Sequence, residues 1–321
     1  MSRLAANSDR PSRDSTLTVP ATALLFPGQG AQAIGMGVAL ADRNSAAAER
    51  FAAASDVVGY DLLEVCRSGP ESRLNATDCA QVALYVHSVA VLETLRNERP
   101  EIFSDVRAVA GLSLGEYSAL TAAGTLPFED GVRVVAARGR AMQQAAEKHR
   151  SGMASVLGLE ESAVHELCDA ARVDGEVLQV ANLLCPGNIA ISGHLGSLEA
   201  AETQSAAAGA SRFIRLAVAG AFHTSLMQDA VEPLRQAIDA ATLRDPQVPI
   251  YCNVDAAPHR SASELPELLT RQVVSPVLWE KTLRSLLDAG VQQFYEIGAG
   301  RVLAGTLKRI DRKIACEAIG D

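Results

Sequence analysis

The fold of this chain is decided by the stretch Val106-Arg107-Ala108-Val109-Ala110-Gly111-Leu112-Ser113-Leu114-Gly115. Its apolar first part predicts a buried strand over 106–111, and a helical pattern follows over 114–123. The same order occurs earlier, where the apolar run 22–26 meets Pro27-Gly28-Gln29-Gly30 ahead of a helical pattern rich in alanine. Strands that alternate with helices in this way form a mainly parallel sheet covered by helices, so the sequence predicts an α/β fold.

A different pattern begins after residue 150. Its predicted elements follow the order βαββαβ, which is typical of a ferredoxin-like unit. They are a strand over 152–159, a helix over 160–171, strands over 177–183 and 188–193, a helix over 195–209 and a strand over 211–217. Residues 150–217 are therefore expected to form a small domain inserted into a larger one.

The larger α/β pattern returns after the insertion. Its further elements are predicted as a helix over 225–241, a strand over 249–254, a helix over 278–289 and a strand over 292–297. The large domain is thus expected to consist of residues 21–149 and 218–321. Residues 1–20 are rich in small polar residues and arginine and lack an apolar core, so they are expected to form a disordered tail.

The composition is that of a globular protein without a nucleic-acid partner. The 321 residues are 48% hydrophobic, enough for a large core with a small second one, and the net charge of −9 opposes binding to phosphate backbones. No membrane partner is expected, because the apolar run 82–92 is broken by His87 and Ser88 and is shorter than the ~18 residues that cross a bilayer. The six cysteines form no CxxC pair, so no metal site or disulfide framework is indicated and a cytoplasmic location is expected.

A candidate nucleophile lies at the turn between the predicted strand and helix. Gly111-Leu112-Ser113-Leu114-Gly115 matches the G-x-S-x-G pattern in the strand–turn–helix setting that a nucleophile elbow requires. The glycines permit a sharp turn that exposes the hydroxyl, and the N–H groups at the start of the helix point toward developing negative charge. An ordinary turn between a strand and a helix is the alternative interpretation.

A serine hydroxyl needs a base within hydrogen-bond reach to act as a nucleophile. His223 is the strongest candidate, because it follows a predicted strand and directly precedes a predicted helix, for which Thr224 is the expected N-cap. A loop histidine with satisfied hydrogen bonds is the alternative. The other histidines are expected to be structural or solvated; they are His87, His149, His165, His194 and His259.

One arginine lies on the apolar side of the predicted helix 129–147. At about 100° per residue, the helix places Arg138 in the apolar stripe, whereas Arg133 and Arg140 fall on the opposite, polar face. A guanidinium that faces the core must meet a buried acidic residue or a ligand anion. The position therefore predicts a receptor for a carboxylate, with an internal salt bridge or a side chain that reaches back to solvent as alternatives.

Five separated motifs share their chain order with one known family. They are Leu25-Phe26-Pro27-Gly28-Gln29-Gly30-Ala31-Gln32, the Ser113 elbow followed by Glu116-Tyr117, Arg138-Gly139, Ala221-Phe222-His223 and Glu296-Ile297-Gly298-Ala299-Gly300-Arg301-Val302-Leu303. Over about residues 21–312 the chain resembles malonyl-CoA:acyl carrier protein transacylases. The resemblance implies an α/β-hydrolase-like parallel-sheet domain with an inserted ferredoxin-like domain. It also implies transfer of malonyl from coenzyme A to the phosphopantetheine thiol of acyl carrier protein, which supplies extender units for fatty-acid synthesis.

The resemblance implies roles for the residues singled out above. Ser113 is expected to be the nucleophile, His223 the general base and acid, and Arg138 the clamp on the malonyl carboxylate. The backbone N–H groups of Gln29 and Leu114 are expected to form the oxyanion hole. The implied cycle is ping-pong through a Ser113 ester, with a coenzyme A thioester and acyl carrier protein as partners, without a metal or redox cofactor and in a monomer.

The same resemblance places further residues around the substrate. The main-chain carbonyl of Gln272 is expected to orient His223, and Gln81 and Asn182 match family positions near the substrate pocket. Phe222 directly precedes His223 and resembles the malonyl-selective form of related polyketide acyltransferase domains, in which the ring crowds an α-methyl branch. Malonyl is therefore expected to be favoured over methylmalonyl.

Two positions depart from the family's pattern. Leu112 stands where the family more often has histidine, and Asn188 stands where glutamine is common after Pro-Gly. Neither change removes a catalytic group, but Leu112 bears on the polarity of the acyl pocket.

Three other functions share parts of these patterns. Gly28-Gln29-Gly30-Ala31-Gln32-Ala33 fits the G-x-G-x-x-A pattern of dinucleotide-binding oxidoreductases, although no acidic residue about twenty positions on clearly ends a second strand. A serine thioesterase or lipase has the same elbow but does not need Arg138. A carrier-docking module without activity does not need Ser113, His223 and Arg138 together.

Overall fold

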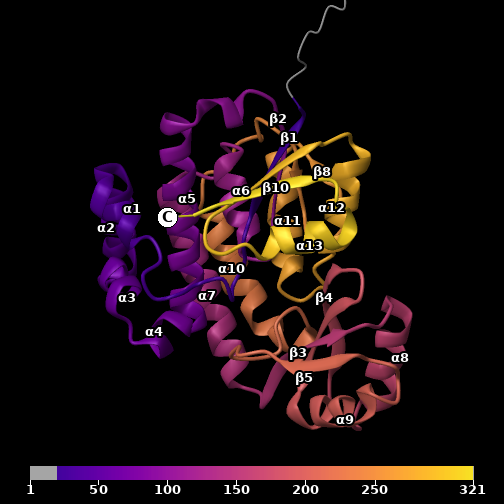
Figure 1. Ribbon diagram of the computed structural model, residues 1–321. Coiled ribbons are helices and arrows are strands. Elements are labelled where there is room, and N and C mark those ends of the chain that lie inside the picture. Colours follow the sequence, from indigo (N-terminus) through magenta and orange to yellow (C-terminus); the bar gives the residue numbers. More distant parts are fainter. Residues whose placement is uncertain (1–19, 321) are drawn as a thin grey trace, which may run out of the picture.

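The computed structural model describes residues 20–320, and its larger part is built on a six-stranded sheet (Figure 1). The strands are β1 (Thr22–Phe26), β2 (Val106–Gly111), β7 (Ile250–Tyr251), β8 (Pro258–His259), β9 (Gln293–Ile297) and β10 (Ala315–Ile319). They lie in the order β10-β9-β1-β2-β7-β8. Neighbouring strands are parallel except β7 and β8, which are antiparallel. The expected mainly parallel sheet is confirmed.

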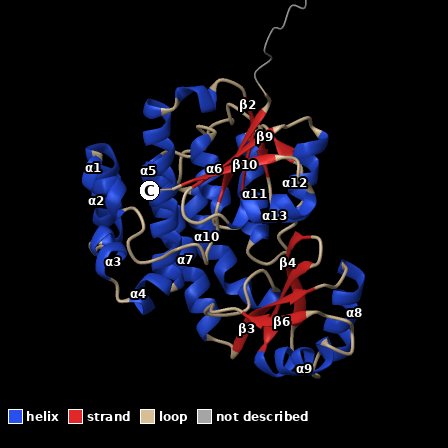
Figure 2. Cartoon of the chain, viewed as in Figure 1, coloured by secondary structure: helices blue, strands red, loops and turns tan. Residues whose placement is uncertain are grey.

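Helices cover both faces of this sheet (Figure 2). Strand β1 needs helices on both sides, because successive side chains of a strand point to opposite faces of the sheet and those of β1 are apolar on both. Leu24 and Phe26 belong to the core beneath α5 and α7, whereas Ala23 and Leu25 pack with residues of α12 and α13. The helices are α1 (Val38–Arg43), α2 (Ser45–Val58), α3 (Leu62–Ser68), α4 (Glu71–Asn75), α5 (Thr77–Glu98), η1 (Pro100–Phe103), α6 (Gly115–Ala122), α7 (Phe128–Glu147), η2 (Ser225–Ala230), α10 (Val231–Asp239), η3 (Ala262–Glu264), α11 (Leu265–Gln272), α12 (Trp279–Asp288) and α13 (Val302–Ile310).

A second, antiparallel sheet has a core of its own (Figures 1 and 2). Its order is β4-β5-β3-β6, and its core contains Val156, Ile191 and Leu198. The elements are β3 (Ser151–Leu157), α8 (Glu161–Ala171), β4 (Leu178–Cys185), β5 (Asn188–His194), α9 (Leu195–Ser205) and β6 (Arg212–Arg215). The expected α/β fold with a second βαββαβ sheet is confirmed. The domain limits at residues 150 and 217 stay a prediction.

The helix expected over 225–241 begins differently in the structure. Its first part is the 3-10 helix η2, and α-helical geometry starts only at Val231. Thr224 is the N-cap as expected, since its hydroxyl accepts a hydrogen bond from the Leu226 N–H at 3.3 Å. Pro233, which lacks an N–H, lies in the first turn of α10, where no intrahelical donor is required.

Two predicted strands are shorter than expected because their ends form the site. The strand expected over 249–254 is reduced to β7, and the chain then turns at Cys252, whose carbonyl accepts from the Ala256 N–H at 3.0 Å. The strand expected over 211–217 ends at Arg215. The next residue, Leu216, still donates to the Met153 carbonyl of β3 at 2.9 Å, and it lines the cavity described below.

Two backbone hydrogen bonds join the antiparallel sheet to the larger unit. Val277 donates to the Ala181 carbonyl at 2.8 Å, and its own carbonyl accepts from the Leu183 N–H at 2.9 Å. The segment ahead of α12 is therefore a short parallel partner of β4 at Asn182. This junction brings Asn182 near the residues that follow α11.

Some expectations concern the chain as a whole. The expected tail, residues 1–20, lies outside the described residues except for Pro20. Among the helices of residues 20–320, none combines the length and the apolar character that a bilayer crossing needs. The six cysteines are all free thiols.

Candidate active site

Ser113 lies in a strained turn at the carboxyl end of β2. Its φ angle is +51°, in the left-handed region that residues with a side chain rarely adopt. The flanking glycines are required by close packing, because a Cβ on Gly111 would overlap the backbone of Gly115, and a Cβ on Gly115 would overlap the carbonyl of Phe26. The expected elbow is therefore present, and Ser113 lines the cavity beside it.

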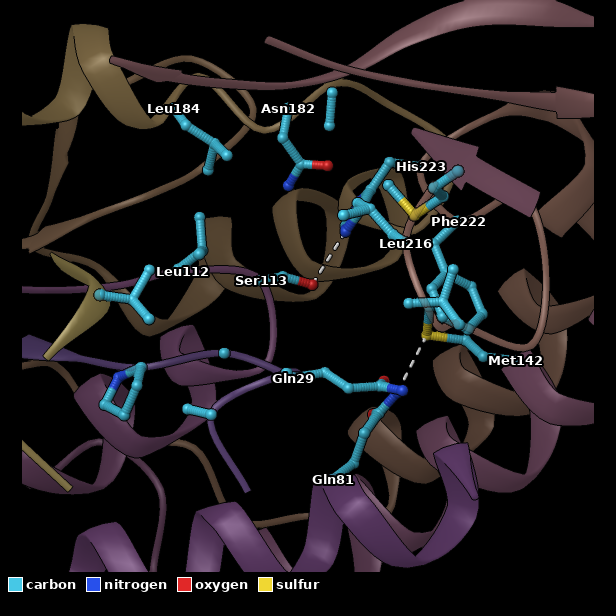
Figure 3. Close-up of a pocket in the computed structure, with 18 of the residues that line it drawn as sticks. Gln29, Gln81, Leu112, Ser113, Met142, Asn182, Leu184, Leu216, Phe222 and His223 are labelled. Atoms are coloured by element: carbon cyan, nitrogen blue, oxygen red, sulfur yellow. Dashed lines mark hydrogen bonds between the residues drawn. The ribbon is translucent and has the colours of Figure 1, made fainter. Parts of the chain in front are cut away.

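His223 lies within hydrogen-bond distance of Ser113 and is itself held by the main chain. Its Nε2 is 2.9 Å from the Ser113 Oγ (Figure 3), and its Nδ1 is 2.9 Å from the Gln272 carbonyl oxygen. Because a carbonyl can only accept, Nδ1 carries the proton and Nε2 presents a lone pair to the hydroxyl. His223 also has a positive φ, +63°, and among the described non-glycine residues only Ala256 joins this pair in that region.

The environment of His223 favours its neutral form. The side chain is 4% exposed, and burial, followed by the charge of Arg138, lowers the pKa of His223 to about 4. Hydrogen bonds to the backbone of Gln272 and Ser275 oppose this shift. The ring is therefore a free base at neutral pH, as acceptance of a proton from a hydroxyl requires.

Arg138 of α7 is 1% exposed and points at the same serine. Its Nη2 donates to the Ser113 Oγ at 3.0 Å and to the Gln272 Oε1 at 2.9 Å, and its Nη1 donates to the Gln81 Oε1 at 2.7 Å. All three acceptors are uncharged, so the internal salt bridge is not formed among the described residues. Its burial also contradicts the alternative in which the side chain reaches solvent, and it lowers the pKa of Arg138 from its usual value.

Ser113, Arg138 and His223 line one cavity of about 270 Å³. It lies between the carboxyl ends of the parallel strands and the antiparallel sheet (Figure 3). Its remaining lining is mostly apolar and includes Leu112, Met142, Leu184, Leu216 and Phe222. An apolar cavity with a few converging polar groups is typical of a site for a small molecule.

The other predicted site residues lie at this cavity or directly behind it. Gln29, Gln81, Asn182 and Phe222 line it (Figure 3), and Leu114 is the N-cap residue of α6. The buried Asn182 Oδ1 has no hydrogen-bond partner among residues 20–320, so it is available to a ligand. The roles of these residues stay predictions.

Two polar residues at the elbow are not among the predicted site residues. Asn253 accepts a hydrogen bond from the Ser113 N–H at its Oδ1 at 2.6 Å and donates from Nδ2 to the Gly111 carbonyl at 2.7 Å. Glu116 accepts from the Asn253 N–H at 3.1 Å across a separation of 137 residues. A local sequence pattern cannot show such contacts, although Glu116 is part of a motif quoted above.

The dinucleotide-binding interpretation does not fit the structure. Helix α1 begins only at Val38, so no helix N-terminus follows Gly28 and Gly30 directly. A Cβ on Gly28 would overlap the Leu112 carbonyl, so Gly28 is needed for contact with the elbow. Among the described residues, no group of three His, Cys, Asp or Glu side chains is placed to hold a metal ion.

The remaining histidines do not line this cavity. His149 and His194 contact each other edge to face, with ring centroids 5.5 Å apart. His259 lies between Asp255 and Glu264, with nitrogen–oxygen distances of 3.0 and 3.2 Å. His223 is therefore the histidine that the structure pairs with Ser113.

The chain is similar to known proteins over nearly its whole length. A family described as "Acyl transferase domain" matches residues 23–316. The malonyl CoA-acyl carrier protein transacylase of Bacillus subtilis (strain 168) is 40% identical over 299 residues, which cover 93% of this chain and 93% of that protein.

Solved structures give the same result. The malonyl CoA-acyl carrier protein transacylase of Coxiella burnetii has a TM-score of 0.89 at 35% identity, with 94% of each chain covered. A malonyl-transacylase solved in complex with its type II PKS acyl-carrier protein has a TM-score of 0.89 at 36% identity, with 94% of this chain and 96% of that chain covered.

Proposed function

The chain belongs to the acyl transferase domain family, and we propose that it transfers a malonyl group from malonyl-CoA to the phosphopantetheine thiol of acyl carrier protein. This reaction supplies extender units for fatty-acid synthesis. One observation carries the proposal: the hydrogen-bonded pair of Ser113 and His223 shares its cavity with Arg138, a buried cation that forms no direct ion pair with a carboxylate of residues 20–320. Relatives named for this reaction cover almost the whole chain.

The first half-reaction acylates Ser113. Its hydroxyl donates to the lone pair of His223 Nε2 and accepts from Arg138 Nη2, so a base and a positive charge lie beside the attacking oxygen. His223 takes the proton as the Ser113 Oγ bonds to the thioester carbon. The N–H groups of Gln29 and Leu114 stabilise the charge on the carbonyl oxygen, and the C–S bond then breaks. His223 returns the proton to the departing coenzyme A thiolate.

Arg138 provides the receptor for the malonyl carboxylate. Among the described residues its side-chain hydrogen bonds go to the neutral groups of Gln81, Ser113 and Gln272, so its charge is available to an anion. A bound carboxylate would also neutralise a charge that lowers the pKa of His223, so malonyl binding makes the base stronger. An acetyl group has no carboxylate, so it can neither bind the Arg138 guanidinium nor strengthen His223 as a base.

The second half-reaction repeats these steps with the carrier's thiol. His223 takes the thiol proton as sulfur attacks the ester carbon, and it returns this proton to Ser113 as the ester bond breaks. Gln81 and Asn182 contact the bound acyl group, and Phe222 crowds an α-methyl branch. The apolar lining of the cavity opposes entry of water, which would hydrolyse the ester.

Finer statements belong to the same proposal. The reaction exchanges an acyl group between thiols and needs only a base, a nucleophile and N–H donors, so it proceeds without a metal or redox cofactor. The protein is expected to act as a monomer in the cytoplasm. A thioesterase or lipase shares the elbow but does not need a buried arginine beside the nucleophile.

Transfer can be tested by following the mass of acyl carrier protein that carries phosphopantetheine during incubation with malonyl-CoA and catalytic protein. We expect the carrier to gain one malonyl group for each coenzyme A released. Carrier without phosphopantetheine is the matched control and should stay unmodified. Release of free malonate with no acylated carrier would identify a thioesterase instead.

A further inference from the structure

Glu116 is a buried carboxylate that the reaction above does not use. It lies in the first turn of α6, is 1% exposed and does not line the cavity. A carboxylate is rarely buried to this extent unless its oxygens meet donors, because its transfer from water is costly. The contacts of Glu116 therefore indicate its role.

Within residues 20–320, this carboxylate accepts hydrogen bonds from a side chain and from the main chain. Its Oε2 accepts from the Gln272 Nε2 at 2.7 Å and from the Asn253 N–H at 3.1 Å, and the Cys252 thiol is a third donor. An ionised carboxylate has acceptors only, whereas a protonated carboxyl or an amide carries a donor at one of its two positions. If its remaining oxygen keeps the bonds to Gln272 and Asn253, that donor replaces the acceptor for the Cys252 thiol, so the three donors together favour the ionised carboxylate.

Gln272 connects the carboxylate of Glu116 to the guanidinium of Arg138. Its Oε1 accepts from Arg138 Nη2 at 2.9 Å, while its Nε2 donates to Glu116 and, at 3.0 Å, to the Ser113 carbonyl. A reversed amide would point its NH₂ at the guanidinium and its oxygen at the carboxylate, and both hydrogen bonds would be lost. The two charges therefore fix Gln272, whose main-chain carbonyl holds His223.

Asn253 connects the same carboxylate to the elbow. Its main-chain N–H is held by Glu116, and its side chain bonds the Ser113 N–H and the Gly111 carbonyl. A residue in the left-handed region costs about 1–3 kcal/mol and persists only when its surroundings hold it there. At Ser113 these surroundings include Asn253 and hence Glu116.

We propose that Glu116 is a positioning residue for acyl transfer. Through Gln272 it fixes the direction of Arg138 and His223, and through Asn253 it holds the turn at Ser113. This inference rests on the proposed function. It implies a loss for every acyl substrate when Glu116 is replaced, and an additional loss for malonyl, because only malonyl has a carboxylate for Arg138 to bind.

The same contacts imply a pH dependence. Burial raises the pKa of Glu116 to about 7, against the hydrogen bonds from Cys252, Gln272 and Asn253 and the charge of Arg138. When the carboxylate takes up a proton, one oxygen becomes a donor facing other donors, and the site loses its alignment. The rate of acylation by malonyl-CoA should therefore increase with pH around pH 7. This rising part of the pH–rate profile is the limb near pH 7.

The other titratable groups around Glu116 change their charge at pH values away from 7. Arg138 on α7 keeps its charge near neutral pH. The pKa of His223 is lowered to about 4, chiefly by burial. Burial raises the pKa of the Cys252 thiol, which follows β7, and that of Tyr117 on α6. Glu116 is thus the group of this set that titrates near pH 7.

The test compares Glu116→Gln with the wild-type chain in the rate of ester formation from malonyl-CoA and from acetyl-CoA. The rates are measured from pH 5.5 to 9, which covers roughly two pH units on either side of the pKa of Glu116. Loss of one buried hydrogen bond in a coupled network should lower kcat/KM for malonyl by about 10- to 100-fold. The loss for acetyl should be smaller, so the malonyl-to-acetyl ratio falls. The limb near pH 7 should disappear.

Glu296→Gln is the matched control, because Glu296 is also buried and accepts from the Leu303 and Ala304 N–H groups at 3.0 and 2.8 Å. It should lower thermal stability while leaving the ratio and the pH limb unchanged. Cys252→Ala covers the case in which Glu116→Gln does not fold. It removes the largest of the contacts that lower the pKa of Glu116, so the limb should move to higher pH.

The outcomes separate this inference from the proposed function. An unchanged malonyl-to-acetyl ratio with an unchanged limb in Glu116→Gln, or an unmoved limb in Cys252→Ala, would overturn the role of Glu116. A wild-type chain that forms no ester with malonyl-CoA would contradict the proposed function itself. A wild-type ester together with the altered ratio supports both.

Discussion

The two sheets of the molecule differ in how regular they are. In the antiparallel sheet, β3 and β5 pair without interruption from Ser151 to Leu157, and an apolar core lies against them. The described non-glycine residues with positive φ all lie outside that sheet. The carboxyl end of β2 instead holds the strained Ser113, and the buried guanidinium of Arg138 on α7 points at it.

This difference indicates that the strain and the buried charge of the site lie at the parallel strand ends, whereas the antiparallel sheet adds lining residues such as Asn182 and has a regular core of its own. Strain and buried charge are unfavourable, so they persist at the parallel sheet only because regular packing elsewhere offsets them. Substitutions at the parallel strand ends should therefore change rates and selectivity, whereas substitutions in the antiparallel core should change stability.

Arg138→Ala should cause the largest change in selectivity. Loss of one side of a buried ion pair costs about 3–5 kcal/mol, so kcat/KM for malonyl-CoA should fall by roughly 10²- to 10³-fold or more. Acetyl-CoA has no carboxylate, so its transfer should stay steady or improve. Initial rates with both thioesters measure the ratio.

Arg140→Ala is the control for this substitution, since Arg140 lies two residues on and is exposed. It should leave both rates unchanged. An Arg138→Ala protein that unfolds, or that slows both substrates equally, would show that Arg138 has a structural role and that the carboxylate is bound elsewhere.

His223→Ala should slow ester formation by at least about 10²-fold, the usual scale of general acid–base catalysis. His194→Ala is the control, because His194 accepts from the Val177 N–H at 2.9 Å and lies outside the cavity. Stopped-flow or quenched ester formation gives both rates. A near-normal rate in His223→Ala would mean that another group takes the proton from Ser113.

Phe222→Ser should raise methylmalonyl transfer relative to malonyl transfer. Space for one added methyl group changes discrimination by about 1–3 kcal/mol, and Phe222 lines the cavity next to His223. Phe213→Ser, at a half-buried position in β6, should leave the ratio unchanged. Competition between the two thioesters measures the ratio, and equal ratios in wild type and Phe222→Ser would place selectivity at other residues.

Ile191→Val should have the smallest effect, and on stability alone. Ile191 is fully buried in the antiparallel core, where removal of one methyl group costs about 0.5–1.5 kcal/mol. The free energy of unfolding should fall by that amount while kcat/KM for malonyl stays the same. A parallel loss of activity would show that the two sheets are not separated in function.

The elements that the sequence predicts best are those whose pattern is local. Strands 22–26 and 106–111 have residues in the cores on both faces of the sheet, and each is followed by a turn, the first at Pro27-Gly28 and the second at Gly111, so an apolar run with a sharp limit marks each one. The strand predicted over 249–254 is longer than the observed strand Ile250–Tyr251, because the residues after Tyr251 contact the distant elbow at Ser113. Such contacts override local preference for a strand.

The candidate site follows the same rule. Ser113 is marked by its glycines and Arg138 by its place on an apolar helix face, and both are predicted from residues near them in the chain. His223 is selected from the six histidines of the chain by its position between a predicted strand and a predicted helix and by the family resemblance. Asn253 and the contacts of Glu116 join segments about 140 residues apart, so only the folded chain brings them together.

The most direct measurement is the intact mass of the protein after brief mixing with malonyl-CoA, followed by digestion to locate the modified residue. We predict one malonyl group per chain, carried by Ser113, and no adduct in Ser113→Ala at an unchanged thermal midpoint, because this hydroxyl contributes little packing. An undiminished adduct in Ser113→Ala, or a malonyl group on another residue, would contradict the account.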